Sequence, residues 1–506
     1  METTVTSILP RASPGDAEEA AGRVLALILV WSRLEPSRVG EVALLPRSAD
    51  GRAYVLGRAG GRKDLPRVAW LRQRPGCNHE TGPLTSPRVS RDQLLLQTLA
   101  GRRLALTNVG KLGLRIRGAD ACEGGLAAPG DLVELDGEAL FMVTERAPTL
   151  PSAMSLGPLH PFGEPDADGV VGESAVAWAL REQIAFVAGR AVHVLVRGES
   201  GTGKELVAQA IHRRSARGAR PLCARNAATI PETLIDAELF GNARNFPQSG
   251  MPERPGLVGE ADGSSLFLDE FAELPAAMQA HLLRVMDQGE YQRLGESRSR
   301  RADFRLIAAT NRPEEALKHD VLARLQLRVE LPGLNDRRED IPLLARALLR
   351  RIAARDSEMA RRFFPGGDPA EHPALGLRLV ASLLTRHYTT HVRELEALLW
   401  RAMTRSRGEL VDAWEEHAVQ WSVAREGPAQ GIELTEPAKG ASSGAGEAAV
   451  EPAAVDPMSI PPEVIQACLD RHGGRQEPAW RELGLSSRHV LTRLVKRHGL
   501  VVRGRR

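Results

Sequence analysis

Short hydrophobic runs broken by turn-forming residues dominate the first third of the chain. They are separated by Gly, Pro and Asn, which is typical of strands joined by tight turns. Asp136-Gly137 predicts a hairpin turn between the last two runs. The pattern predicts an all-β sandwich over residues 23–147. The runs cover 24–31, 53–57, 94–99, 103–107, 131–135 and 139–144.

The run from Val24 to Trp31 is wholly apolar. It is far too short to cross a bilayer, and acidic residues precede it, so it predicts neither a membrane span nor a signal peptide. We expect it to form a buried strand in a cytoplasmic protein that has no membrane partner. The four cysteines are scattered along the chain and predict neither a metal site nor a disulfide.

A different pattern begins near residue 169. Apolar strings over 194–197, 264–268 and 304–309 alternate with helical patterns, which predicts a parallel α/β sheet across 169–335. Ligands of such sheets bind at the carboxyl ends of the strands. Apolar residues then recur at helical spacing over 336–424, which predicts a helical subdomain. Examples at that spacing are Ile341, Leu344, Leu348 and Ile352.

The remaining segments differ in composition. Residues 148–168 are rich in Pro, Ser, Gly and Asp, which predicts a linker. Residues 425–460 are dominated by Ala, Gly, Pro, Glu and Ser, which predicts a flexible linker. The whole chain has a net charge of only +3, but residues 461–506 carry ten Lys or Arg against four Asp or Glu. This segment predicts an anionic partner.

Helical patterns separated by glycines over 461–506 predict an all-α helix-turn-helix. Basic side chains of such a motif neutralise DNA phosphates and pair with base edges. The alternative is a charged, solvated face on a small helical bundle. The outward-facing candidates for DNA binding are Arg488, His489, Thr492, Arg493, Lys496 and Arg497.

A glycine-rich loop separates an apolar run from a helical pattern at 198–205. Glycines allow backbone N–H groups to surround phosphates, and the helix N-terminus adds positive potential. Lys204 is suited to the outer phosphates of ATP, although Glu205 stands where the general pattern has Ser or Thr. The alternative is a glycine-rich turn that carries a lysine. The candidate ATP-binding residues here are Gly198, Glu199, Ser200, Gly201, Thr202, Gly203, Lys204 and Glu205.

Two carboxylates end the second buried-strand pattern. Asp269 is suited to hold the Mg²⁺ that neutralises phosphate charge, and Glu270 to polarise an attacking water. An ordinary strand end is the alternative for the pair. The Asp269–Glu270 pair lies downstream of a phosphate loop, and this position favours an ATPase site.

These motifs together resemble the central domain of sigma-54-dependent transcriptional activators, which are bacterial enhancer-binding proteins of the AAA+ class. The resemblance covers about 169–424, and in that family the phosphate loop does end in Glu. It implies ATP and Mg²⁺ as cofactors, a ring of subunits, sigma-54 RNA polymerase as a partner, and a Fis-type DNA-binding domain over 461–506. The matching strings are Gly198–Glu205, Asn226–Ala228, Asp236–Gly241, Arg254–Gly256, Ser265–Glu270, Ala308–Arg312, Arg337–Leu344 and His391–Leu395.

The resemblance also implies roles for single residues. Asn226 matches the residue that restrains the catalytic Glu270. Thr310 and Asn311 match the first nucleotide sensor, and Arg393 matches the second.

Two further positions match the arginine fingers that complete a neighbouring subunit's ATP site. Arg324 keeps one finger, whereas Lys318 replaces the other. Lysine has the charge but not the planar fork of arginine. This change implies weaker hydrolysis rather than weaker nucleotide binding.

The family contacts sigma-54 through a loop that reads Gly-Ala-Phe-Thr-Gly-Ala. Its length is preserved here, but Pro247 and Gln248 replace the contacting Phe and Thr. Proline also stiffens the backbone and removes a donor. We expect this chain not to engage sigma-54 in the usual way. The loop residues are Asn245, Phe246, Pro247, Gln248, Ser249 and Gly250.

The first domain resembles a forkhead-associated (FHA) domain, a sandwich that binds phosphothreonine. Arg58, Ser90 and Arg91 match its phosphate-binding motifs. Gln93 replaces a His, and Leu112 replaces the Asn that grips the peptide backbone. The alternative is a sandwich that has lost this ligand and only mediates assembly.

The sequence thus predicts a cytoplasmic, ATP-binding and DNA-binding transcriptional regulator with three modules. One alternative is an ATP-switched repressor or co-regulator that assembles with an intact paralogue. Another is an AAA+ remodeller of a different protein target.

Overall fold

The computed structural model describes residues 22–47, 51–152, 160–412, 466 and 468. The predicted flexible linker and nearly all of the predicted helix-turn-helix lie outside this part of the chain, as do the six residues expected to contact DNA. Those expectations therefore remain predictions. Residues up to 427 form one compact unit, and the following paragraphs concern that unit alone.

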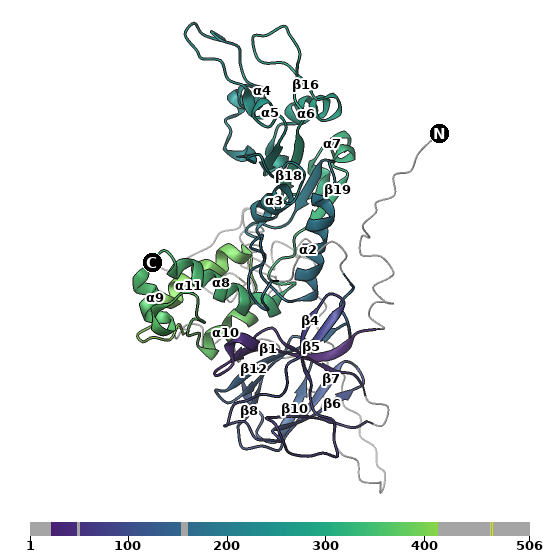
Figure 1. The fold of residues 1–506 in the computed structure, drawn as a ribbon, viewed down its shortest axis with the longest axis vertical. Helices are drawn as coiled ribbons and strands as arrows, with labels where there is room; N and C mark the ends of the chain where they lie inside the picture. Colours follow the sequence, from purple (N-terminus) through teal and green to yellow (C-terminus); the bar gives the residue numbers. More distant parts are fainter. Residues whose placement is uncertain (1–21, 48–50, 153–159, 413–465, 467, 469–506) are drawn as a thin grey trace, which may run out of the picture. The chain divides into compact units, whose positions relative to one another are not determined.

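The first domain is built from two antiparallel sheets, so the prediction of a β-rich domain is confirmed (Figure 1). One sheet has the order β5-β4-β2-β1-β12-β11-β8-β9 and the other β10-β7-β6-β3. Leucine and valine side chains from both sheets form the core between them. The strands are β1 (Val24–Ser32), β2 (Val42–Leu45), β3 (Tyr54–Leu56), β4 (Trp70–Arg74), β5 (Cys77–Glu80), β6 (Leu94–Leu99), β7 (Arg103–Asn108), β8 (Leu114–Ile116), β9 (Ala119–Asp120), β10 (Gly124–Ala127), β11 (Leu132–Leu135) and β12 (Ala139–Arg146).

A parallel sheet forms the centre of the second domain, as predicted, and it has five strands where three were expected. Its order is β14-β15-β18-β13-β19, so the first strand in sequence lies inside the sheet. The strands are β13 (Val194–Arg197), β14 (Cys223–Asn226), β15 (Ser265–Asp269), β18 (Arg305–Thr310) and β19 (Leu327–Glu330). The helices are α2 (Ala175–Ala188), α3 (Lys204–Arg213), α4 (Ile235–Phe240), α5 (Gly256–Glu260), α6 (Ala276–Gln288) and α7 (His319–Arg324).

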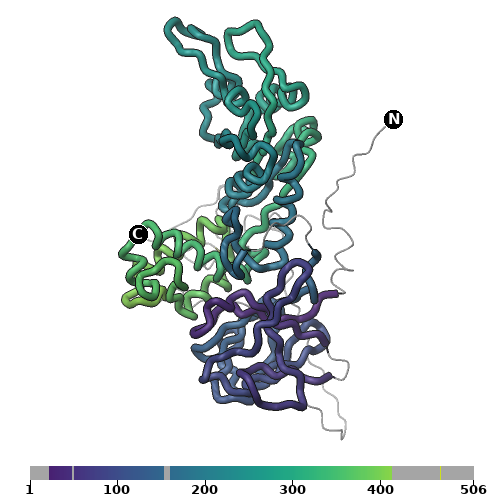
Figure 2. Tube along the Cα trace, viewed as in Figure 1, coloured from purple at the N-terminus to yellow at the C-terminus, as the bar shows by residue number. Residues whose placement is uncertain are grey.

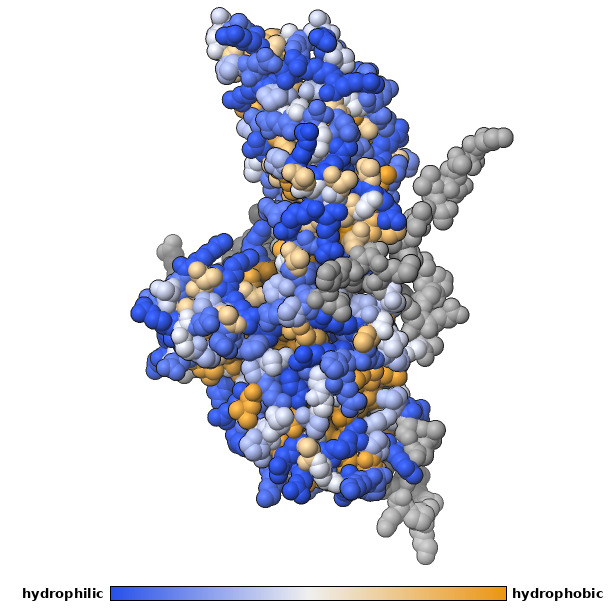
Figure 3. All heavy atoms as spheres, viewed as in Figure 1, coloured by the Kyte–Doolittle hydropathy of each residue, from blue (hydrophilic) through white to orange (hydrophobic). Residues whose placement is uncertain are grey.

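Two loops project side by side from this domain, one between α4 and α5 and the other in the hairpin of β16 (Glu290–Tyr291) and β17 (Arg300–Arg301) (Figure 1). Hydrophilic side chains dominate their surface (Figure 3). They are joined at the base, where the Ala243 N–H donates to the Leu294 carbonyl at 2.9 Å.

Four helices form the predicted helical subdomain: α8 (Ile341–Ala353), α9 (Ser357–Phe363), α10 (Leu377–Thr385) and α11 (His391–Arg405). The predicted apolar face of α8 is buried. So are Leu343, Ala345 and Arg346 on other sides of the same helix. Burial on more than one side follows because α8 packs against the other helices and also against the β domain.

Strand β1 is buried on both faces, which explains its uninterrupted apolar sequence. Leu25, Leu27 and Leu29 point into the core between the two sheets. Ile28 and Val30 point the other way, into a core shared with α8, α10 and α11. Figure 2 shows the purple trace of β1 beside the green trace of these helices. The β domain and the helical subdomain therefore share one hydrophobic core.

Polar contacts also join the β domain to the start of the α/β domain. The buried carboxylate of Glu173, just before α2, accepts from Arg74 of β4 at 3.0 Å and from the Gly163 N–H at 2.7 Å. The Trp178 indole N–H donates to the same carboxylate at 3.2 Å. Burial raises the pKa of Glu173. Gly163 lies in the segment predicted as a linker, so that segment is partly a packed element.

Within the described ranges, no helix has the length and apolar character needed to cross a membrane.

Candidate functional site

The phosphate loop runs from the end of β13 to the start of α3. Gly203, at the N-cap of α3, has φ +102°, a conformation that favours glycine. The Lys204 side chain is only 7% exposed, and its ammonium donates to the carbonyl oxygens of Gly198 at 3.1 Å and Glu199 at 3.2 Å. An ammonium has three donors, so one remains for a phosphate oxygen.

The parallel register brings the other candidate residues to the same edge of the sheet. Asn226 and Asp269 are paired positions at the ends of β14 and β15. Thr310 ends β18, and its carbonyl oxygen accepts from the Gly198 N–H at 3.3 Å. The loop, the carboxylates and the first predicted sensor thus meet where parallel sheets bind ligands.

Glu270 follows Asp269 directly and adopts a left-handed conformation with φ +49°. Non-glycine residues in this region are uncommon and cost energy, and they cluster at functional sites. The Asp269 Oδ1 atom accepts from the Glu270 N–H at 2.9 Å, which leaves the second oxygen of Asp269 for a cation. The Asn226 side chain accepts from the Ala228 N–H at 2.9 Å, and among the described residues no hydrogen bond joins it to Glu270.

The start of α11 lies directly on the phosphate loop. Arg393 donates to the Ser200 hydroxyl at 3.3 Å, and the Val392 N–H donates to the Gly201 carbonyl at 3.0 Å. A Cβ atom on Gly201 would lie 2.2 Å from the Thr390 carbonyl oxygen, so only glycine fits there. The second predicted sensor is therefore beside the loop. Asn311 is exposed just beyond β18.

His391 has a role that its sequence motif did not reveal. Its Nδ1 atom accepts from the Leu334 N–H at 3.2 Å, so the ring donates through Nε2 to the Glu199 carboxylate at 2.8 Å. Its φ of +45° is a second strained position at this site. The histidine ties the helical subdomain to the phosphate loop. The sequence motif over His391–Leu395 identified this segment as part of the ATPase region, but it did not predict the contact with Glu199.

The two predicted arginine-finger positions, Lys318 and Arg324, lie on or beside α7. They are not at the phosphate loop of the same chain. Arg324 makes a two-bond ion pair with Asp287 of α6, with distances of 2.8 and 3.1 Å. This pairing lowers the pKa of Asp287 and raises that of Arg324. Lys318 is exposed at the N-cap of α7.

The loop between α4 and α5 is folded back on itself. The Asn245 side chain accepts from the Gly250 N–H at 2.9 Å, and Asn245 itself has φ +64°. The Asn242 amide donates to the Phe246 carbonyl at 3.2 Å. The Phe246 ring is 38% exposed and packs on Gly295 of the neighbouring hairpin, where an added Cβ would lie 2.5 Å from it.

In the β domain, Gln93 is held by three hydrogen bonds. Its amide donates to Asn108 at 2.9 Å and to the Leu112 carbonyl at 3.1 Å, and it accepts from the Ser90 N–H at 3.1 Å. The nearby Arg58 Nε atom is buried and has no hydrogen-bond partner within the described ranges. Arg91 is exposed.

Comparison with known proteins agrees with this geometry. Residues 170–331 match the family model described as the sigma-54 interaction domain. The transcriptional regulatory protein ZraR of Salmonella typhimurium is 36% identical over 333 residues, which cover 64% of this chain and 68% of ZraR. The chain belongs to the sigma-54-dependent transcriptional regulators. The matched region of this regulator contains the phosphate loop, both carboxylates and the first predicted sensor.

The regulator is also similar to other proteins. The Nif-specific regulatory protein of Bradyrhizobium diazoefficiens is 35% identical over 356 residues, covering 64% of this chain and 59% of that protein. Among solved structures, NtrX from Brucella abortus in complex with ADP has 28% sequence identity and a TM-score of 0.43, covering 66% of this chain and 70% of that one.

Proposed function

We propose that this regulator binds and hydrolyses ATP at the carboxyl edge of its parallel sheet and couples hydrolysis to transcription. The observation that carries this proposal is the meeting of Lys204, Asp269, Thr310 and Arg393 at one edge, from the start of α3, two strand ends and the distant helix α11. Lys204 and the loop amides bind the phosphates, and Arg393 senses them from the helical subdomain.

The chain's own residues fit a hydrolytic site. The second carboxylate oxygen of Asp269 would hold the Mg²⁺ that neutralises phosphate charge. Glu270 takes a proton from the attacking water, and its left-handed backbone conformation is of the kind that clusters at functional sites. In the structure, the Asn226 side chain accepts from the N–H of Ala228 in its own turn. Asn226 is paired with Asp269 on the neighbouring strand, so its side chain can exchange this contact for one with Glu270.

A ring of subunits would complete this site. Arg324 reaches a neighbour's phosphate only after it leaves Asp287, so the ion pair holds the finger in a resting position. The pair is exposed, and exposed ion pairs contribute little stability, so release costs little. Lys318 supplies a positive charge but lacks the planar guanidinium of an arginine finger, and this favours slow ATP hydrolysis.

We further propose that the loop at 245–250 does not engage sigma-54 in the family's usual way. Pro247 and Gln248 lack the side chains that make this contact. The loop is also braced by Asn242 and Asn245, and Phe246 packs on Gly295 of the neighbouring hairpin. These contacts hold the loop in one conformation.

Replacing Pro247→Phe together with Gln248→Thr is expected to restore binding. The full-length protein with an ATP transition-state analogue should bind sigma-54 at least about tenfold more tightly than the unaltered protein, since apolar anchors dominate interface energies. The measurement is co-migration with sigma-54 in size-exclusion chromatography and a titration of affinity.

The matched control is Pro247→Ala with Gln248→Ala, which removes the proline without restoring the side chains. It should not bind. A family member with an intact loop serves as the positive control. Tight, analogue-dependent binding by the unaltered chain would instead show that its loop works as it stands.

We also propose that residues 461–506 bind DNA. Two alternative functions are compatible with DNA binding. A repressor or co-regulator that uses ATP only as a switch is favoured by Lys318 and the altered loop. It predicts that Glu270→Gln changes promoter output far less than deletion of 461–506. A remodeller of another target predicts DNA binding that falls with salt but does not discriminate sequence.

We also propose a phosphothreonine partner for the β domain, as in FHA domains. The buried Arg58 Nε atom lacks an acceptor, and a phosphate oxygen would supply one. Titration with a phosphothreonine peptide and its unphosphorylated form tests this, and Arg58→Ala should abolish any difference between them. Equal binding of both peptides would favour a role in assembly.

A further inference from the structure

His391 joins three segments of the chain that are far apart in the sequence. It is the first residue of α11, is only 1% exposed, and donates through Nε2 to the Glu199 carboxylate at 2.8 Å. Its Nδ1 atom accepts from the Leu334 N–H, in the segment after β19. Gly333 makes room for the ring, because a Cβ atom there would lie 2.6 Å from the His391 Cε1 atom. The ring is therefore held on one side while it holds the phosphate loop on the other.

The contact with Leu334 decides what the His391 ring can do. A backbone N–H can only donate, so Nδ1 must accept, and the proton of the neutral imidazole is on Nε2. Nε2 is the atom that faces Glu199. The backbone thus selects the tautomer in which His391 donates to a carboxylate, and hydrogen bonds to an ionised acceptor are stronger than neutral ones.

The backbone of His391 supports a functional role. Its φ of +45° costs energy for a residue other than glycine, and such conformations persist only where the surroundings determine them. Part of the support comes from Glu394, whose carboxylate accepts from the N–H groups of Thr389 and Thr390 at 2.9 and 3.3 Å. These bonds fix the turn directly before His391, so the direction of its ring is fixed as well.

Three successive residues of α11 contact three successive residues of the phosphate loop. Beside the His391–Glu199 bond, Val392 and Arg393 contact Gly201 and Ser200. A loop rich in glycine has many accessible backbone conformations, so contacts of this kind are needed to select one of them. The bond from His391 is the shortest of the three and the one with a carboxylate acceptor.

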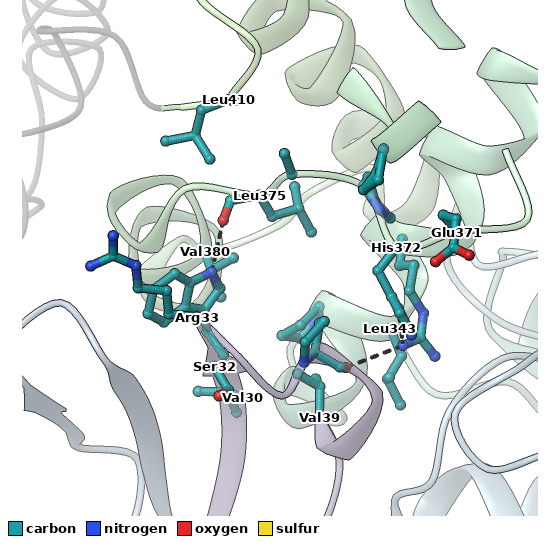
Figure 4. Close-up of a pocket in the computed structure, with 17 residues that line it drawn as sticks. Val30, Ser32, Arg33, Val39, Leu343, Glu371, His372, Leu375, Val380 and Leu410 are labelled. Atoms are coloured by element: carbon teal, nitrogen blue, oxygen red, sulfur yellow. Dashed lines mark hydrogen bonds between the residues drawn. The ribbon is translucent and has the colours of Figure 1, made fainter. Parts of the chain in front are cut away.

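The helix is the fixed partner in this contact. Helix α11 packs in the core that α8 and α10 share with β1. The Trp31 indole N–H of β1 donates to the Leu375 carbonyl oxygen at 2.8 Å, at the wall of a cavity between the β domain and the helical subdomain (Figure 4). The Glu199 side chain, by contrast, is 72% exposed. The contact therefore positions the loop more than it positions the helix.

We propose that His391 is a positioning residue for ATP binding, which holds the phosphate loop through Glu199 in the conformation that receives the phosphates. This inference rests on the ATP site proposed above, and the experiment distinguishes the failure of one from the failure of the other.

The test is a double-mutant cycle on the affinity of the full-length protein for ATP, measured by titration with a fluorescent ATP analogue. Glu199→Ala removes the acceptor, and His391→Phe removes the donor but keeps a ring. Each should raise the Kd about tenfold, because the loop then spends less time in the binding conformation. The double variant should be within about twofold of the weaker single variant, since both changes remove one contact.

Glu199→Gln separates positioning from a merely structural role. Glutamine keeps an acceptor oxygen for the Nε2–H of His391, so the Kd should stay within about threefold of that of the unaltered protein. Glu182→Ala, which removes an exposed glutamate of α2, is the matched control and should leave the Kd unchanged. Thermal unfolding checks that each variant is folded.

Three outcomes would overturn the inference. They are an unchanged Kd in Glu199→Ala, additive effects in the double variant, and a Glu199→Gln protein that binds ATP as weakly as Glu199→Ala. If His391→Phe does not fold, the two Glu199 variants decide, because that side chain is exposed. Lys204→Ala tests the site itself. If the unaltered protein binds no ATP, or Lys204→Ala binds it equally well, the proposed site is wrong and the inference falls with it.

Discussion

Replacing Ile28 with aspartate is expected to unfold the helical subdomain together with the β domain. Ile28 is 1% exposed and points into the core that β1 shares with α8, α10 and α11. The change removes a buried aliphatic side chain and places an unpaired carboxylate in its position. Together these effects cost more than about 4 kcal/mol, a large part of the usual stability of a domain.

The measurement is thermal unfolding with and without nucleotide, together with limited proteolysis of the helical subdomain. In Ile28→Asp we expect α8–α11 to become protease-sensitive and nucleotide binding to be lost. Leu126→Asp is the matched control, because Leu126 is an exposed leucine of β10 in the same domain. If the β domain of Ile28→Asp is unfolded but the protein still binds nucleotide, the two domains fold independently.

Glu270→Gln is expected to lower the rate of ATP hydrolysis by roughly 10²–10⁴-fold, the usual contribution of a positioned general base. Affinity for ATP should stay within about threefold, since Lys204 and the loop amides bind the phosphates and are untouched. The amide keeps the size and backbone of the glutamate, so the left-handed conformation at this position is preserved. Steady-state turnover and nucleotide titration measure the two quantities separately.

Glu273→Gln is the control for this experiment. Glu273 is three residues further along and pairs with Arg312 at 2.6 Å, outside the strand ends that form the site. Its turnover should stay within about twofold of the unaltered rate. If Glu270→Gln hydrolyses ATP as fast as the unaltered protein, another group supplies the base, and the assignment of Glu270 fails.

Much of the architecture follows from local patterns. The apolar run at 24–31 predicted a buried strand, and β1 is one. The strand ends at Asp269 and Thr310 were predicted from apolar strings that stop at polar residues. Parallel pairing of the strands then places Asp269 and Thr310 close together, because the carboxyl ends of parallel strands lie at the same edge of the sheet.

Contacts between distant segments could not be predicted in this way. Nothing in the run at 24–31 identifies α8 as the cover for its second face, because hydrophobicity has no direction and fits any apolar partner. The Arg324–Asp287 and His391–Glu199 pairs likewise depend on how helices α7 and α11 dock. A charge pattern along one segment carries no information about such docking.

The shared core also constrains how this regulator could have been inherited. A sensor attached by a linker can be exchanged by recombination, because each module keeps its own interior. Here a crossover that replaced residues 23–147 would leave Leu343 and Val380 facing water, while the incoming domain would lack a strand that is apolar on both faces. Substitutions in β1 must therefore be matched in α8 and α10. We therefore expect the β domain and the helical subdomain to be inherited together, because strand β1 contributes to the core of both.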